Sequence, residues 1–161
     1  VVPFSVAGID SGNITQGHRR MGRGPFSVTN FKAYKQTLET KGHVILCACE
    51  RKNIIRRDAQ KICADAGLAL VEDEGLLAEV AGLAEWPTVL LGDMDPAFLK
   101  LPPEVIQLSM RSHQKYFSVN DKNGKLAAHF VVVDRPAKHM KRAFTVNARA
   151  PWTTTRETGM G

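Results

Sequence analysis

The spacing of hydrophobic and polar positions changes several times along this chain, and each change predicts a new structural element. In four segments apolar residues recur every three or four positions, which is the period of an amphipathic helix. Residues that start or stop helices bound these segments, with Asn30 before the first and Gly67 after the second. The predicted helices cover residues 31–42, 50–66, 73–84 and 103–115.

Short apolar runs between these segments predict β-strands. The last two runs flank a turn sequence that contains Gly124, and this arrangement predicts a β-hairpin near the C-terminal end. The fold class that follows is α/β or α+β, with mixed short strands and packed helices in a single domain over residues 1–133. The predicted strands cover residues 1–6, 44–47, 68–71, 88–91, 116–119 and 126–133.

The composition is that of one domain with an aliphatic core. The chain has 161 residues, of which 43% are hydrophobic and only 7% aromatic. No run of 18 or more apolar residues occurs, and the first ten residues do not resemble a signal peptide, so we expect a cytoplasmic protein without membrane contact. Residues 134–161 have no hydrophobic period and are predicted to be a divergent, poorly packed tail.

The cysteines and acidic residues give no sign of a metal site. Cys47, Cys49 and Cys63 are odd in number and contain no CxxC pair, which argues against a disulfide framework or zinc. We expect reduced and mostly buried thiols, with the first two on one face of a strand. The carboxylates of residues 72–95 have no His or Cys beside them, and they suit a helix N-terminus and an exposed helix face.

The net charge of +6 is unevenly distributed along the chain. Residues 1–71 carry 11 Lys and Arg against 5 Asp and Glu, and residues 96–161 carry 11 against 4. Residues 72–95 between them carry 7 acidic and no basic residues. Such a surface can bind a polyanion in some places and repel it in others, although a solvated basic surface would show the same totals.

Three groups of residues are candidates for phosphate or base contact. In the loop over residues 8–20 the glycines permit close approach of a partner, and a basic run follows them, but the loop lacks the Gly-Lys-Ser/Thr end of a Walker motif. Two predicted helices carry basic stripes opposite their apolar faces. A structural turn and two solvated helix faces are the alternatives. The candidates are His18, Arg19, Arg20, Arg56, Arg57, Arg111, Gln114, Lys115 and, for stacking on a base, Tyr116.

Six blocks of sequence are specific when they are taken together and in order. They cover residues 11–19, 50–55, 73–77, 85–92, 101–105 and 113–117. These blocks resemble successive stretches of the β subunit of the bacterial two-subunit glycyl-tRNA synthetase. The resemblance covers about residues 1–133 and does not extend into the tail.

The resemblance implies an internal part of a longer β chain in a heterotetramer of two α and two β subunits. In this family the α subunit binds ATP and glycine and uses Mg²⁺, so no cofactor and no aminoacylation site are expected here. The implied partners are tRNA(Gly) and the α subunit. Two alternatives remain open: a hydrolytic editing domain in which His18 or His113 positions water, and a structural linker. Whether the chain is itself an enzyme is therefore left open.

Overall fold

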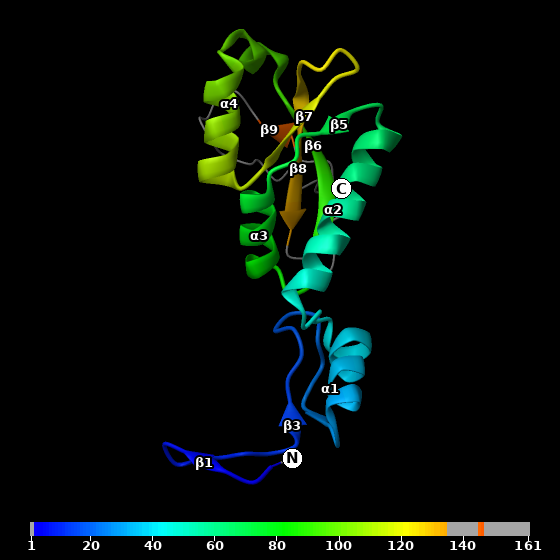
Figure 1. The fold of residues 1–161 in the computed structure, drawn as a ribbon, viewed down its shortest axis with the longest axis vertical. Helices are drawn as coiled ribbons and strands as arrows, with labels where there is room; N and C mark the ends of the chain where they lie inside the picture. Colours follow the sequence, from blue (N-terminus) through cyan, green and yellow to red (C-terminus); the bar gives the residue numbers. More distant parts are fainter. Residues whose placement is uncertain (1, 135–144, 147–161) are drawn as a thin grey trace, which may run out of the picture.

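The computed structural model describes residues 2–134 and the short strand at residues 145–146. Helices and a mostly antiparallel sheet form the body, which comprises residues 47–134 and the strand at 145–146. Residues 2–46 form an arm that extends away from one end of the body (Figure 1). The predicted mixed α/β class, with a single small domain, is confirmed.

The sheet of the body has five strands in the order β5-β7-β8-β6-β9. The central pair, β6 and β8, is antiparallel, with Val89 opposite Val133 and Leu91 opposite Val131. The predicted hairpin is present as β7 and β8. Only the short β9 runs parallel to its neighbour, β6. The strands are β5 (Ala69–Leu70), β6 (Thr88–Met94), β7 (Phe117–Asn120), β8 (Leu126–Asp134) and β9 (Thr145–Val146).

Alternation along β8 explains how the helices are placed on the two faces of this sheet. Val131 belongs to the larger core cluster with α2 (Ala48–Asp65) and α3 (Glu74–Leu83). Its neighbour Phe130 belongs to the second cluster, with Ile106 of α4 (Pro103–Ser109). Successive strand residues point to opposite faces, so the body has three layers, with α4 on one side of the sheet and α2 and α3 on the other.

Two helices end in a π-helical turn, Leu38–Gly42 after α1 (Phe31–Thr37) and Met110–Gln114 after α4. A short 3-10 helix, Pro96–Lys100, precedes α4. Each π-helical turn closes on a non-glycine residue in the left-handed region, His43 with φ 52° and Lys115 with φ 58°.

The arm consists of two small ribbons and α1 (Figure 1). As predicted, Asn30 caps α1, because its side-chain oxygen accepts the amide N–H of Ala33 at 2.9 Å. The ribbons pair β1 (Ser5–Val6) with β2 (Ile9–Asp10) and β3 (Ile14–Thr15) with β4 (Phe26–Ser27). The predicted strand over residues 1–6 is therefore reduced to two residues, and the predicted glycine-rich loop contains β2 and β3.

The predicted strand at residues 44–47 is wrong. The amide of Ile45 donates to the carbonyl of Glu85 at 2.9 Å, and the carbonyl of Ile45 accepts from Arg51 at 2.6 Å, so no strand pairs with this run. Cys47 immediately precedes α2 and Cys49 lies in its first turn, which leaves both thiols exposed and not on one face of a strand. Cys63 is buried as expected, and burial raises the pKa of its thiol to about 11.

The remaining predicted helices are present with small shifts at their ends: α2 begins at Ala48, and α3 spans Glu74–Leu83. The predicted tail over residues 134–161 lies outside the described residues except at its first residue and at β9, which pairs with β6. The interpretation of this segment as a tail remains a prediction.

Candidate nucleic-acid interface

The N-terminus of α3 is where two of the predicted basic residues converge. Asp73 caps this helix: one carboxylate oxygen accepts the amide N–H of Leu76 at 2.8 Å, and the other accepts Nε–H of Arg111 at 2.6 Å. The Leu76 amide, with Arg111 beside it, lowers the pKa of Asp73 below its usual value. Asp73 is therefore charged at neutral pH and holds Arg111 over the first turn of α3.

The next residues extend this ion-paired cluster. Arg56 of α2 pairs with Glu74, and Lys115 pairs with Glu79 of α3 at 2.8 Å. Together with Asp73 and Arg111, three acidic and three basic side chains neutralise one another around α3. Three of the seven acidic side chains of residues 72–95 are therefore neutralised by the two basic stripes on either side.

The other predicted residues on the helices are also engaged within the chain. Arg57 pairs with the adjacent Asp58 at 2.8 Å, and Gln114 is half-buried. The ring of Tyr116 stacks on Phe130, with centroids 4.4 Å apart and planes 7° from parallel. One face of that ring is therefore used by the core.

The glycines of the loop before Arg19 allow close packing within the chain. A Cβ on Gly17 would lie 2.5 Å from Cα of Gly42, and the amide of His18 donates to the carbonyl of Gly42 at 2.6 Å. Nδ1 of His18 accepts the backbone N–H groups of Arg20 and Met21 at 3.2 and 3.3 Å. The loop is thereby held against the end of the π-helical turn, and the alternative interpretation as a structural turn accounts for Gly17.

His18 also borders a cleft of about 280 Å³ at the C-terminal end of α3, lined by Gly82, Leu83, Glu85 and Trp86 as well. Because Nδ1 accepts hydrogen bonds, the neutral imidazole carries its proton on Nε2. The ring therefore has no free basic nitrogen with which to take a proton from water. His113, the other histidine considered for hydrolysis, is exposed on the second π-helical turn.

The arm has a surplus of basic residues, most of which make no ion pair. Residues 2–46 contain six Lys and Arg and two Asp and Glu. The sequence predicted Arg19 and Arg20 as RNA contacts but not Arg23, Lys32 or Lys41. The net charge of residues 1–71 as a whole conceals the surplus, which appears when residues 2–46 are taken alone. In the arm the following exposed side chains make no ion pair: Arg19, Arg20, Arg23, Lys32 and Lys41. In the described part of the body, Lys100, Lys122 and Lys125 are likewise exposed without an ion pair, but they do not form one run with the arm.

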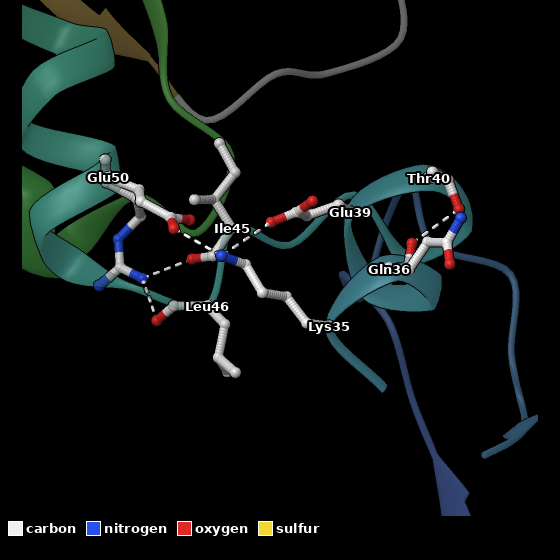
Figure 2. Close-up of polar contacts among 8 residues, drawn as sticks. Lys35, Gln36, Glu39, Thr40, Ile45, Leu46 and Glu50 are labelled. Atoms are coloured by element: carbon white, nitrogen blue, oxygen red, sulfur yellow. Dashed lines mark hydrogen bonds and ion pairs between the residues drawn. The ribbon is translucent and has the colours of Figure 1, made fainter. Parts of the chain in front are cut away.

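The sixth base of the arm, Lys35, holds the arm to the body. Figure 2 shows its ammonium group between two carboxylates, 2.5 Å from Glu50 and 3.8 Å from Glu39. Beside it, the guanidinium of Arg51 donates to the carbonyls of Ile45 and Leu46 at 2.6 and 3.0 Å. A third hydrogen bond runs from Arg51 to the carbonyl of Ala81 at 2.7 Å. These contacts fix the base of the arm against α2 and α3.

The described residues contain no group of three or more His, Cys, Asp or Glu side chains that could hold a metal ion. The expectation that this chain holds no metal remains a prediction. In the same part of the chain, none of the helices has the length and hydropathy needed to cross a bilayer.

Comparison with known proteins gives consistent matches. A family model described as glycyl-tRNA synthetase beta subunit matches residues 1–148. A glycine–tRNA ligase beta subunit of Phenylobacterium zucineum is 56% identical over 135 residues, which is 83% of this chain and 20% of the relative. The beta subunit of a Ruegeria species is 48% identical over 136 residues, which is 84% of this chain and 20% of the relative. That of Geobacter sulfurreducens is 45% identical over 135 residues, which is 83% of this chain and 19% of the relative. The chain thus spans about a fifth of the length of the curated relatives it matches.

Proposed function

Because the chain belongs to the glycyl-tRNA synthetase β-subunit family, we propose that it serves glycine–tRNA ligation by contacting tRNA(Gly) through its arm. In this proposal the chain supports the ATP-dependent attachment of glycine to tRNA(Gly) and is not the aminoacylation site. ATP, Mg²⁺ and glycine bind to the α subunit of a cytoplasmic heterotetramer of two α and two β subunits, which the β chain also contacts.

One observation carries the choice of surface: five of the six bases of the arm are exposed without ion pairs, whereas the predicted bases Arg56, Arg111 and Lys115 are paired with acids at α3. A phosphate that binds an unpaired guanidinium displaces only water and counterions. A phosphate that binds Arg111 must first compete with Asp73, a carboxylate that is already in place 2.6 Å away. RNA phosphates therefore bind the arm without the free-energy cost of breaking an ion pair.

An aromatic ring lies next to this charge. Phe31 is 70% exposed at the start of α1 and precedes the unpaired Lys32. Its centroid is 6.4 Å from that of Tyr34, at a tilted angle of 40°. Exposed rings beside Lys and Arg are a common platform for unstacked bases in single-stranded RNA. Phe31 is accordingly the stacking residue of the proposal, a role for which the sequence had suggested Tyr116.

The test compares two variants with the same loss of charge. Arg19→Gln, Arg20→Gln and Arg23→Gln are combined in the arm, and Arg56→Gln, Arg57→Gln and Arg111→Gln in the body. Affinity for tRNA(Gly) is measured over a range of salt concentrations. If each arm residue contacts a phosphate, the slope of log K against log salt should flatten by about 2–3 units, since each contact contributes about 0.7–0.9.

The variant of the body should retain the slope of the unchanged protein. Thermal melting of both variants controls for folding, and exposed ion pairs contribute little to stability. A flatter slope for the body variant with an unchanged arm variant would overturn the proposal in favour of the helix stripes. Absence of salt-dependent binding by the unchanged chain would overturn it as well.

Hydrolysis of mischarged tRNA remains the alternative function. It requires a group that activates water, and Nδ1 of His18 is already engaged by two backbone N–H groups. A deacylation assay with mischarged tRNA decides between the two, and the proposal expects no difference from the rate without protein.

A further inference from the structure

The ribbon formed by β1 and β2 carries an apolar face that nothing in the described structure covers. Val2, Phe4 and Val6 alternate along the first strand and its approach, which places them on the same face. Ile9 is the cross-strand partner of Val6 and joins them there. Their exposed fractions are 76%, 62%, 63% and 75%.

This ribbon has few contacts of its own. Each strand has two residues, and the hydrogen bonds beyond that pairing join Ser11 to Val2 and Phe4. A two-stranded ribbon of this size is marginal in water, and both of its edges present free backbone groups. An apolar face beside open edges is suited to the addition of further strands, because the same partner then satisfies the backbone and covers the side chains.

Two facts indicate the kind of partner. The family match begins at residue 1, so the ribbon belongs to the region that the family shares, and this region is about a fifth of the relatives' length. The face offers only four large apolar side chains, whereas a stable interface between separate proteins uses about 20–30 residues on each side. A face this small is sufficient when its partner is tethered, since a linker supplies a high effective concentration.

We propose that this ribbon is a docking edge for polypeptide from the remainder of a full-length β subunit, which adds a strand to it and covers Val2, Phe4, Val6 and Ile9. The ribbon thereby joins the arm to the rest of the subunit. This inference rests on family membership and the apolar face, and is independent of RNA contact by the arm.

The first test is crosslinking within a full-length subunit. Residues 1–135 of this chain replace the aligned segment in the β subunit from Phenylobacterium zucineum, and p-benzoylphenylalanine replaces Phe4. Illumination should join position 4 to a peptide from the other four-fifths of the same polypeptide, without an increase in mass. The control carries the same group at Leu108, which is 65% exposed on α4. A crosslink to a second copy, a crosslink to the α subunit, or no more crosslinking than at position 108 would overturn the proposal.

The second test measures hydrogen exchange of the amides at residues 5–10. These amides should exchange at least tenfold more slowly in the full-length subunit than in the 161-residue chain. Val6→Thr with Ile9→Thr, which keeps β-branched side chains, should remove this protection, whereas Val105→Thr with Leu108→Thr on α4 should not. Equal exchange in the two proteins, or equal loss with both pairs of substitutions, contradicts docking by the ribbon. Melting of the 161-residue variants shows whether the body remains folded.

Discussion

Asp73 combines a helix cap and an ion pair in one side chain, and two substitutions separate the roles. Asp73→Asn keeps an oxygen that can accept the amide N–H of Leu76, but it removes the charge that holds Arg111. Asp73→Ala removes both interactions. The first substitution therefore reports the charge alone, and the difference between the two substitutions reports the cap.

The structure sets the expected magnitudes. The hydrogen bond from Leu76 is 2.8 Å long and the carboxylate is mostly shielded from solvent, with 29% of its side chain exposed. Loss of such a cap costs about 1 kcal/mol, which for a protein of this size lowers the melting temperature by about 2–4 °C. The contribution of Arg111 is smaller, because its side chain is 51% exposed and solvent screens the pair.

The assay is urea unfolding of the three proteins at several pH values. The pKa of Asp73 is lowered in the folded state, so the carboxylate stabilises the fold fully above its unfolded pKa of about 3.9. That contribution is lost as the pH falls through the folded pKa. In acid, the free energy of unfolding of the unchanged protein should therefore approach that of Asp73→Asn. The difference in free energy of unfolding between the Asn and Ala variants should stay constant with pH.

Two results would refute this reasoning. If Asp73→Asn were as damaging at pH 7 as Asp73→Ala, the cap would not be the main contribution. If the gap between the unchanged protein and Asp73→Asn did not shrink in acid, the charge would not be its cause. The Asn variant also examines the rival RNA surface: if Arg111 binds phosphate, its release from Asp73 should strengthen tRNA binding and steepen the dependence on salt.

Two further predictions concern the core. Gly92→Ala should destabilise the body by about 1–3 kcal/mol in thermal or urea unfolding, because the new Cβ would lie 2.4 Å from the ring of Phe130; Gly82→Ala, with nothing within 4 Å, should instead be neutral or slightly stabilising. Iodoacetamide at pH 8 should modify the two exposed cysteines and leave Cys63, whose buried thiol has a pKa of about 11, until denaturant is added. Mass spectrometry distinguishes two adducts from three, and rapid modification of Cys63 in the folded protein would contradict its burial.

Local patterns in the sequence were enough to predict most of the body and the start of α1 in the arm. The period of α2, the turn between β7 and β8 and the cap at Asn30 are each set by residues close together in the chain. The run at residues 44–47 was misread for a different reason. Its apolar residues suit a strand, but its backbone partners are Glu85 and Arg51, and no local pattern reveals a carbonyl bonded to a guanidinium.

The interface was harder to predict because it depends on which charges meet. Arg56 and Arg111 are separated from the acids they bind by 18 and 38 residues. From the sequence, the acidic segment between two basic ones was read as a region that repels a polyanion. Packing of α2 and of the turn after α4 beside α3 instead pairs three acids of that segment with bases of the two stripes. Five bases without ion pairs lie on the arm, and of these the sequence predicted only Arg19 and Arg20 as RNA contacts.

His43 and Lys115, which close the π-helical turns, each combine a strained backbone with a side-chain contact to a distant part of the chain. The left-handed conformation costs a residue with a Cβ on the order of 1 kcal/mol, and glycine would remove that strain. Glycine would also delete the ion pair between Lys115 and Glu79 and the edge contact between His43 and Trp86, whose ring centroids are 5.3 Å apart. A redesign that minimised backbone strain alone would place glycine at both positions. The turn after α4 would then lose its ion pair with α3, and the turn after α1 would lose its contact with the loop that follows α3.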